Sequence, residues 1–129
     1  MTRTEYSLEV IDHYSHPRNP GALPDATGRG QSGQGTGGEL LIQIAIRAKN
    51  GVVEEARFRA FGCSASIASA SMATELLAGR TLPRALELGP EEIEQALGGL
   101  PASRQHCAAH AAAAARDAVQ DHLAHAGSL

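Results

Sequence analysis

The chain has 129 residues, 43% of them hydrophobic and only 3% aromatic, so we expect a single domain over residues 1–129 with a core of Leu, Ile, Val and Ala. The formal net charge is −3 at pH 7 and no block of Lys or Arg stands out, which argues against a nucleic-acid partner. The apolar runs are too short to span a bilayer and the N-terminal residues do not resemble a signal peptide, so we expect a cytoplasmic protein with no membrane contact.

The first part of the chain predicts one helix followed by a glycine-rich stretch. Residues 4–15 place apolar side chains on one broad face, with Thr4 as the candidate cap, and Pro17 ends this helix. Residues 17–38 contain a dense run of glycines, which favours a flexible loop. The stretch lacks the terminal Gly-Lys-Ser/Thr of a phosphate-binding loop, and no strand precedes it.

A β-hairpin is predicted next. Residues 39–48 alternate between apolar and polar side chains, residues 52–61 alternate again, and Asn50-Gly51 between them is typical of a tight hairpin turn. The side chains expected on the covered face of the first strand are Leu40, Ile42, Ile44, Ile46 and Ala48. Because two strands alone are marginally stable, part of residues 29–36 is a candidate third strand.

Helices are predicted for the rest of the chain, at about 65–78, 82–88, 90–97 and 103–124. Thr81 is placed to cap the second of them, and Pro90 and two glutamates suit the first turn of the third. A helix, an antiparallel hairpin and then a run of helices indicate the α+β class, with a short antiparallel sheet packed against helices and a long C-terminal helix.

Two cysteines, Cys63 and Cys107, are the residues most open to chemistry. In a reducing compartment metal binding or reactivity is the informative alternative to a disulfide, and a pair of small buried thiols is the plain alternative. Each cysteine is expected at the start of a helix, where free N–H groups and the helix dipole stabilise a thiolate and lower its pKa. Gly62 lets the backbone turn just before Cys63.

The histidines give a weaker pattern. His106 precedes Cys107 directly, and two adjacent residues can both reach one metal ion only from an irregular first turn. His110 can share a helix face with either, but is more typical of a half-buried helix histidine than of a ligand. The remaining histidines show no closely spaced ligand pattern and are predicted to lie on the surface: His13, His16, His122 and His125.

Three stretches of the chain together resemble one family. These stretches are Val10-Ile11-Asp12-His13-Tyr14 followed by Pro17-Arg18-Asn19, Ala56-Arg57-Phe58 running through Phe61-Gly62-Cys63 into Ile67-Ala68-Ser69-Ala70-Ser71 and Thr74-Glu75, and His106-Cys107 before a long terminal helix. In this order and spacing, over nearly the whole chain, they resemble the IscU/NifU-type iron–sulfur cluster assembly scaffold family.

The resemblance implies an α+β fold and a scaffold that is not an enzyme. On such a scaffold a transient [2Fe–2S] cluster is built from iron, electrons and the persulfide sulfur of a cysteine desulfurase, and then passes to apo iron–sulfur client or carrier proteins. The resemblance also implies that Zn²⁺ or Fe²⁺ can bind at the same site.

This chain departs from the family pattern at the first of the three family cysteines. Gly37 takes the place of that cysteine, and Glu39 takes the place of the nearby aspartate. The candidate ligands are therefore Glu39, Cys63, His106 and Cys107, with His110 in reserve. They suit zinc better than a cluster, because thiolates are the usual cluster ligands; two subunits together could supply four thiolates.

Two alternatives to the scaffold follow from these departures. A degenerate paralogue could bind zinc or persulfide and modulate the desulfurase without holding a cluster. A thiol enzyme could use Cys107 and His106 as a nucleophile pair, although the sequence offers no third orienting group. The run Leu100-Pro101-Ala102-Ser103-Arg104 replaces the family's Leu-Pro-Pro-Val-Lys-like run, which argues against recognition by an Hsp70/J-type chaperone.

Overall fold

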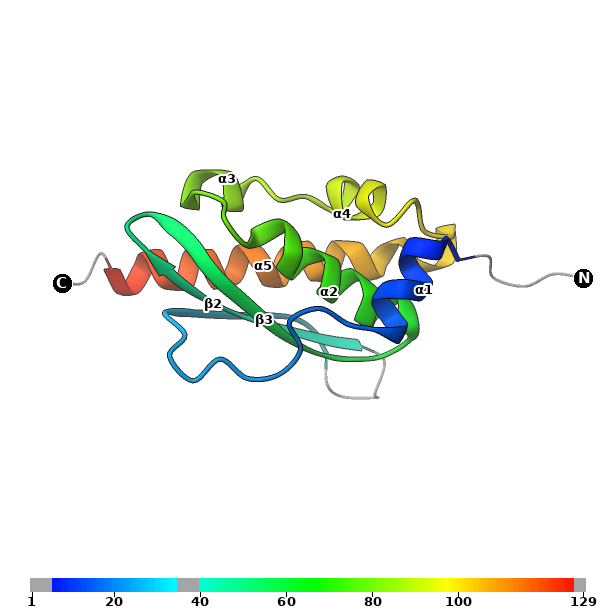
Figure 1. The fold of residues 1–129 in the computed structure, drawn as a ribbon, viewed down its shortest axis with the longest axis horizontal. Helices are drawn as coiled ribbons and strands as arrows, with labels where there is room; N and C mark the ends of the chain where they lie inside the picture. Colours follow the sequence, from blue (N-terminus) through cyan, green and yellow to red (C-terminus); the bar gives the residue numbers. More distant parts are fainter. Residues whose placement is uncertain (1–5, 35–39, 127–129) are drawn as a thin grey trace, which may run out of the picture.

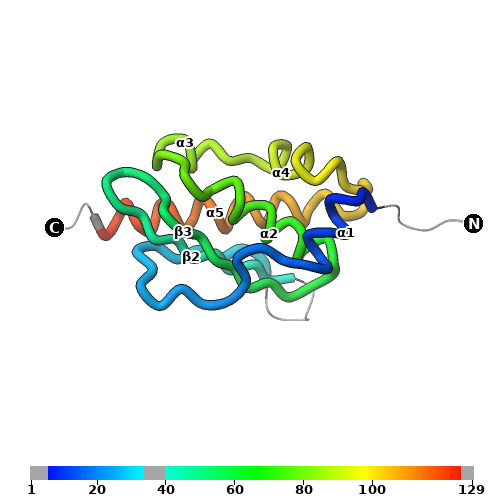
Figure 2. The backbone as a smooth tube through the Cα atoms, viewed as in Figure 1, coloured from blue at the N-terminus to red at the C-terminus, as the bar shows by residue number. Residues whose placement is uncertain are grey.

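The protein combines a three-stranded antiparallel sheet with helices packed on one of its faces (Figures 1 and 2). The computed structural model describes residues 6–34 and 40–126. The elements in chain order are α1 (Leu8–Ser15), β1 (Gly28–Gln34), β2 (Leu40–Lys49), β3 (Val52–Phe61), α2 (Ser64–Leu77), α3 (Leu82–Leu86), α4 (Pro90–Ala96), the 3₁₀ turn η2 (Ala102–Arg104) and α5 (Gln105–Ala126). The predicted α+β class is confirmed.

The β2–β3 hairpin forms as its alternating pattern predicts. Asn50 and Gly51 have φ angles of 56° and 78°, the pair of positive values that a tight two-residue turn requires. The isoleucines of β2, Ile42, Ile44 and Ile46, are fully or almost fully buried beneath the helices. Burial of this one face fixes the register of the sheet, because a one-residue slip would expose every one of them.

The glycine-rich stretch is a strand over part of its length, so the flexible loop predicted for residues 17–38 is wrong there. β1 pairs with β2 from Gly28 opposite Ile46 to Gln34 opposite Leu40, which confirms the candidate third strand. The glycines are needed because α5 lies directly on the strand: a Cβ added at Gly30 would overlap the backbone of Ala118 and lie 2.5 Å from the Ala114 carbonyl oxygen. The sequence shows that side chains are missing at these glycines, but it does not show that α5 fills the space beside them.

Carboxylates of α5 cover the free edge of β1. The backbone N–H of Arg29 donates to Asp121 Oδ2 at 2.8 Å, and that of Gln31 donates to Asp117 Oδ2 at 3.0 Å. The two aspartates are four residues apart on the helix, a rise of about 6 Å, and the two N–H groups are two residues apart on the strand, a rise of about 6.8 Å. The carboxylates are therefore spaced to match the N–H groups. The edge is thus closed to pairing with another chain.

The helical layer is built mainly from small side chains. Most residues of α2 are buried, and they are largely alanine and serine. α5 packs against α2, α3, α4 and the strands β1 and β2, and it contributes a row of buried alanines (Figure 1). Small residues let these elements approach closely, which explains a core with few aromatic side chains. Among the helices the structure describes, none is long and apolar enough to cross a membrane.

Helix α1 begins at Leu8, later than the predicted residue 4. Its cap is Ser7, whose Oγ accepts a hydrogen bond from the Val10 N–H at 3.0 Å; Thr4, the predicted cap, lies outside the described residues. The Ser7 hydroxyl also donates to the Leu97 carbonyl, just beyond α4. One side chain therefore both starts α1 and ties it to the end of another helix.

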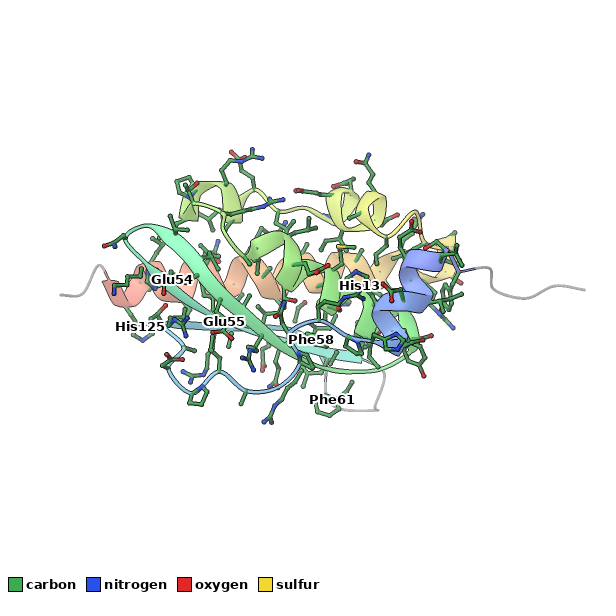
Figure 3. All side chains as sticks on the ribbon, in the orientation of Figure 1. His13, Glu54, Glu55, Phe58, Phe61 and His125 are labelled. Atoms are coloured by element: carbon green, nitrogen blue, oxygen red, sulfur yellow. The ribbon has the colours of Figure 1, made fainter. Side chains whose placement is uncertain are left out.

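His13 is buried at 5% exposure, so its predicted place on the surface is wrong. Figure 3 shows it on the inner side of α1. Its Nδ1 lies 2.8 Å from Ser71 Oγ on α2, and its Nε2 lies 3.3 Å from Glu75 Oε1. The backbone N–H of Arg18 donates to the same Ser71 Oγ, so the hydroxyl is free to donate to His13 Nδ1. This network suits a neutral ring and fixes α1 on α2.

We expect the stability of the protein to fall as the pH drops below about 6.5, the ordinary value for histidine. Burial, and then the charge of Arg18, lower the pKa of His13 in the folded state, while Glu75 and Asp12 oppose the shift. Between the two pKa values the unfolded chain binds a proton that the folded chain does not, so protonation favours unfolding there.

Urea denaturation across this pH range, with the wild type beside His13→Asn, measures the effect. The variant should lose about 2 kcal/mol at neutral pH with its hydrogen bonds, and it should also lose this part of the pH dependence. The exposed His16 provides the matched control, His16→Asn, which should keep the wild-type profile. An identical pH profile for His13→Asn would show that His13 does not titrate in this window.

Candidate functional site

The two cysteine thiols meet at the start of two helices. Cys63 is the N-cap residue of α2, and Cys107 lies in the first turn of α5. Their Sγ atoms are 3.8 Å apart, although the residues are 44 positions apart in the chain. Gly62, with a φ of 145°, makes the turn that carries β3 into α2 and sets Cys63 at this point. The predicted convergence of the two thiols is therefore confirmed.

Ser66 joins the two thiols, a role that sequence reasoning missed. Its Oγ lies 3.5 Å from Cys63 Sγ and 3.5 Å from Cys107 Sγ, and the residue is buried. It follows Cys63 by three positions in α2, the spacing that places two side chains on one face of a helix. That spacing is visible in the sequence, but only the position of α5 shows that the hydroxyl also reaches Cys107.

The two thiols differ in electrostatic environment. Burial opposes ionisation of Cys63, but hydrogen bonds from Ser66, Cys107 and the backbone outweigh it and lower the pKa of Cys63. At Cys107 burial dominates and raises the pKa to about 11. The expectation that both helix starts would lower the thiol pKa is thus correct for Cys63 and wrong for Cys107, where the loss of water outweighs the Ser66 hydrogen bond and the Arg104 charge.

Arg104 brings positive charge to the pair from η2. The Tyr6 side chain and then the Cys63 sulfur raise the pKa of Arg104, with a smaller contribution from Cys107. Its Nε atom is buried and has no hydrogen-bond partner among the described residues. The charge of this guanidinium lowers the pKa of Cys107, but burial outweighs it there.

The two histidines of α5 play different parts. His106 is exposed, and its Nε2 lies 3.8 Å from Cys107 Sγ, within reach of a shared ion after a small movement. His110 Nδ1 lies 2.8 Å from Ser32 Oγ on β1, so this ring is engaged by the sheet and not by the thiols. The reserve role considered for His110 has no support in this geometry.

The thiol pair fits a tetrahedral metal ion, although the site is incomplete among the described residues. Two metal–sulfur bonds of about 2.3 Å at the tetrahedral angle place their sulfurs about 3.8 Å apart, and the observed separation is 3.8 Å. No group of three His, Cys, Asp or Glu side chains in residues 6–34 and 40–126 is arranged to hold a metal ion. Glu39, the predicted fourth ligand, and Gly37 lie outside the described residues, so their place at the site stays a prediction.

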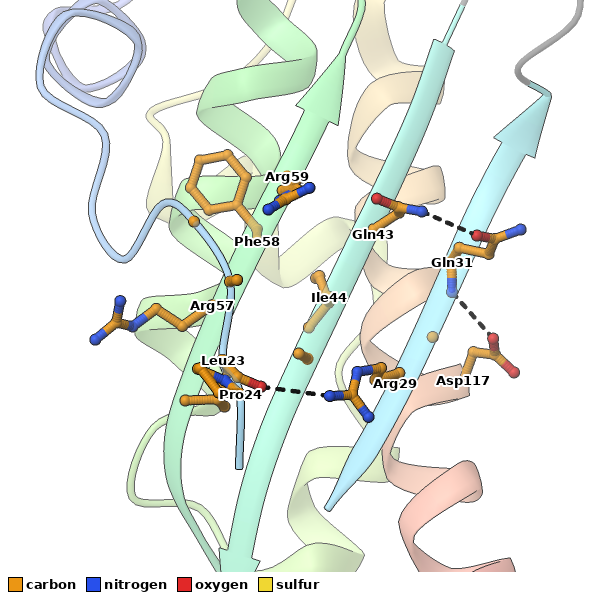
Figure 4. Close-up of a pocket in the computed structure, with 14 residues that line it drawn as sticks. Leu23, Pro24, Arg29, Gln31, Gln43, Ile44, Arg57, Phe58, Arg59 and Asp117 are labelled. Carbon is orange, nitrogen blue, oxygen red and sulfur yellow. Dashed lines mark hydrogen bonds between the residues drawn. The ribbon is translucent and has the colours of Figure 1, made fainter. Parts of the chain in front are cut away.

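A separate pocket of about 450 Å³ lies on the outer face of the sheet, away from the thiols. Figure 4 shows the chain around Leu23 and Pro24 crossing this face, with Gln31 and Gln43 side by side on neighbouring strands. The Gln43 amide donates to Gln31 Oε1 at 3.3 Å, and none of the residues around the pocket belongs to the thiol site. The residues that line this pocket therefore do not contribute ligands to a metal ion held by the cysteines.

Fold and site together define an α+β protein with a dithiol held between two helix starts at one end of a three-stranded sheet. The NifU-like N-terminal domain family matches residues 5–128, and the chain belongs to this family.

Curated relatives are similar over most of their length. The chain is 41% identical to the iron–sulfur cluster assembly scaffold protein IscU 1 of Archaeoglobus fulgidus, covering 96% of this chain and 80% of that protein. It is 40% identical to the iron–sulfur cluster assembly scaffold protein IscU of Azotobacter vinelandii, covering 91% of this chain and 93% of that one.

Solved structures share the fold. A protein described as an iron–sulfur cluster assembly scaffold for the SUF system from Fervidobacterium islandicum aligns with a TM-score of 0.66 at 16% identity, over 88% of this chain and 96% of that one. A NifU-like protein from Brucella abortus aligns with a TM-score of 0.63 at 15% identity, over 92% and 94%.

Proposed function

We propose that this protein is a scaffold for iron–sulfur cluster assembly. It takes sulfur from a cysteine desulfurase, combines it with iron, and passes a [2Fe–2S] cluster to apo client or carrier proteins in the cytoplasm. It acts as a carrier of this cargo and not as an enzyme. The family and the scaffold proteins about 40% identical to this chain support the proposal.

The observation that carries the proposal is the spacing of the two sulfurs. At 3.8 Å they match one edge of a tetrahedral iron or zinc site. Cys63 is partly exposed, so iron and sulfur can approach from solvent on that side. His106 and Glu39 are the proposed further ligands, since each offers a nitrogen or oxygen donor to complete four-coordination.

Metal analysis of the purified protein, followed by anaerobic reconstitution with iron and a sulfide source, tests the proposal. A scaffold should acquire iron and acid-labile sulfide in equal amounts and show the visible absorption of a [2Fe–2S] cluster. The cluster should then pass to an apo-ferredoxin. Reconstitution that yields no iron, no sulfide and no visible band would refute the scaffold function.

A second candidate function is supported by the cysteine count of two. A degenerate paralogue would bind zinc or a persulfide and modulate the desulfurase without holding a cluster. In that case the purified protein should contain zinc, and reconstitution should leave it colourless. The same experiment therefore separates the two candidates.

Replacing Gly37 with cysteine should raise the amount of cluster retained. A thiolate at this position would add a third soft sulfur ligand, which an iron–sulfur cluster prefers to a carboxylate. We expect the iron and acid-labile sulfide that remain after gel filtration to increase severalfold over the wild type.

Leu123→Cys gives the matched control, because Leu123 is 40% exposed near the far end of α5, so the added thiol lies away from Cys63 and Cys107. Equal retention by the wild type and Gly37→Cys would mean that residue 37 does not mark a missing ligand. If neither protein retains any cluster, the degenerate paralogue gains support.

A cysteine desulfurase is the proposed sulfur donor, and α1 provides a surface suited to it. Leu8, Ile11 and Tyr14 are 82%, 49% and 48% exposed, an unusual concentration of apolar surface on one short helix. α1 lies at the same end of the molecule as the start of α5 (Figure 1), so a partner bound there is close to the thiols.

Association with the desulfurase of the same organism should weaken at least about tenfold in Ile11→Asp, since a buried charge at an interface is costly. Leu123, 40% exposed near the far end of α5, gives the matched control Leu123→Asp, which should bind normally. Wild-type protein that fails to capture the desulfurase in a pull-down would contradict this partner.

The geometry favours neither a dedicated Hsp70/J-type chaperone nor a thiol enzyme. Leu100 is buried and Pro101 is the N-cap residue of η2, so the run up to Arg104 is folded into the structure and is not presented as an extended peptide. We therefore expect little or no stimulation of a scaffold-specific Hsp70 ATPase. Cys107 is 1% exposed, which closes it to an external substrate.

A further inference from the structure

The two thiols lie close enough for a change of side-chain rotamer to bring their sulfurs together. Both cysteines are free, and their sulfurs lie 3.8 Å apart with the Ser66 hydroxyl beside both. A disulfide bond is about 2.05 Å long, so the sulfurs need to approach by about 1.8 Å to bond. Rotation of the partly exposed Cys63 side chain at the start of α2 can supply such a movement.

The two thiols differ in access. Cys63 is partly exposed, whereas Cys107 is 1% exposed and faces the Cys63 sulfur from inside the protein. A sulfur donor arriving from solvent therefore meets Cys63 first. In a persulfide formed on Cys63, the inner sulfur is Cys63 Sγ, and Cys107 Sγ lies 3.8 Å from it. Attack by Cys107 on this inner sulfur would release the outer one.

We propose that the metal-free protein reduces a delivered persulfide to sulfide, with Cys63 as the acceptor and Cys107 as the resolving thiol. The proposal rests on the proposed function, which supplies the persulfide. It goes beyond that function because the two thiols themselves provide the electrons, and no external reductant takes part in the step that releases sulfide.

Both steps balance. In the first, a donor persulfide R–S–SH reacts with the Cys63 thiol to give R–SH and Cys63–S–SH; the donor's sulfur–sulfur bond breaks and a new one forms on Cys63. In the second, the Cys107 sulfur attacks Cys63 Sγ and the bond to the outer sulfur breaks; the Cys107 proton passes to the outer sulfur, which leaves as H₂S. The outer sulfur gains two electrons, and the two cysteines lose two as they form the Cys63–Cys107 disulfide.

A bound metal ion should switch this reaction off. Zinc or ferrous iron held by both thiolates removes the acceptor and the resolving thiol together. Sulfur would therefore be released as sulfide when the site holds no metal, and retained on the protein when iron is present. The presence of only two cysteines fits this chemistry, since no third thiol competes to resolve the persulfide.

The test uses reduced, metal-free full-length protein with one equivalent of glutathione persulfide in anaerobic buffer without added reductant, and the Cys107 variants measure the sulfide that the released glutathione produces by itself. We expect about one sulfide per chain and a protein that has lost two hydrogens, with peptide mapping that links Cys63 to Cys107. Cys107→Ala and Cys107→Ser should instead gain the mass of one sulfur on Cys63 and release sulfide at least about tenfold more slowly, because the intramolecular thiol is gone. Cys63→Ser should do neither.

Two results would overturn the proposal: a wild-type protein that keeps the added sulfur without releasing sulfide, or release that is equally fast in the Cys107 variants. Using both alanine and serine at this buried position, with a melting curve for each, separates lost chemistry from lost folding. Addition of one equivalent of Zn²⁺ should stop the wild-type reaction, and continued release would contradict the shared site. Failure of cluster reconstitution leaves these measurements unchanged, so the two proposals are tested separately.

Discussion

Gly30→Ala should destabilise the protein by about 3 kcal/mol and lower its melting temperature by roughly 10 °C. The added methyl group would overlap the backbone of Ala118, lie 2.5 Å from the Ala114 carbonyl oxygen and 2.7 Å from the Asp117 carbonyl carbon. These are backbone atoms in the middle of α5 and cannot rotate away. The helix can make room only by separating from β1, which also lengthens the hydrogen bond from Gln31 to Asp117.

Urea and thermal denaturation of Gly30→Ala beside Gly89→Ala measure this effect. Gly89 is a fair control because its tightest contact with an added Cβ would be the flexible Glu91 carboxylate, at 3.1 Å, and the Glu87 carbonyl oxygen would lie at an ordinary 4.0 Å. Gly89→Ala should lower the free energy of unfolding by less than about 1 kcal/mol. If Gly30→Ala melts with the wild type, α5 and β1 do not pack backbone against backbone in solution, and close packing does not explain the glycines of β1.

Cys63→Ser and Cys107→Ser should each weaken metal binding at least about 100-fold, more than the 10- to 100-fold typical for loss of a residue that only supports a ligand. A serine hydroxyl is a poor ligand for zinc or iron compared with a thiolate, and the remaining cysteine has no second sulfur at 3.8 Å. Competition for Zn²⁺ against a chromophoric chelator gives the affinities. The double variant should bind no metal above background.

His106 and His110 test the rest of the ligand set in the same assay. The Zn²⁺ affinity of His106→Ala should fall about tenfold if the His106 ring completes the site. His110→Ala should bind Zn²⁺ like the wild type, because the His110 ring is held by Ser32. Full affinity in Cys63→Ser would place the metal elsewhere. The melting curve of each variant is needed beside its affinity, since Cys107 is buried and its replacement also alters the core.

The local elements were predictable because their causes are local. Alternation in β2 and β3, Asn50-Gly51 between them and the helix boundaries depend on neighbouring residues, and the structure confirms each within a few positions. The placement of Cys63 and Cys107 at two helix starts follows from the same patterns, and the motifs around them were sufficient to indicate the family.

Other features depend on elements distant in the chain, and there the sequence misled. The glycines before Gln34 predict a loop from sequence, but in the structure they form a strand because α5 packs directly against them. The polarity of His13 predicts a surface position on an amphipathic helix, yet the residue is buried against Ser71 and Glu75 of α2. The first turn of α5 favours an ionised Cys107, but its burial beneath neighbouring elements raises its pKa.

The sequence by itself determined the α+β class, the family and the choice of Cys63 and Cys107 as the candidate site. Only the tertiary structure decided that those thiols lie 3.8 Å apart, that Ser66 lies beside both, and that Cys63 is partly exposed while Cys107 is buried. The physical reason is that turns and periodicity act through adjacent residues, whereas distance, burial and pKa at the site arise from packing α2, α5 and η2 against one another.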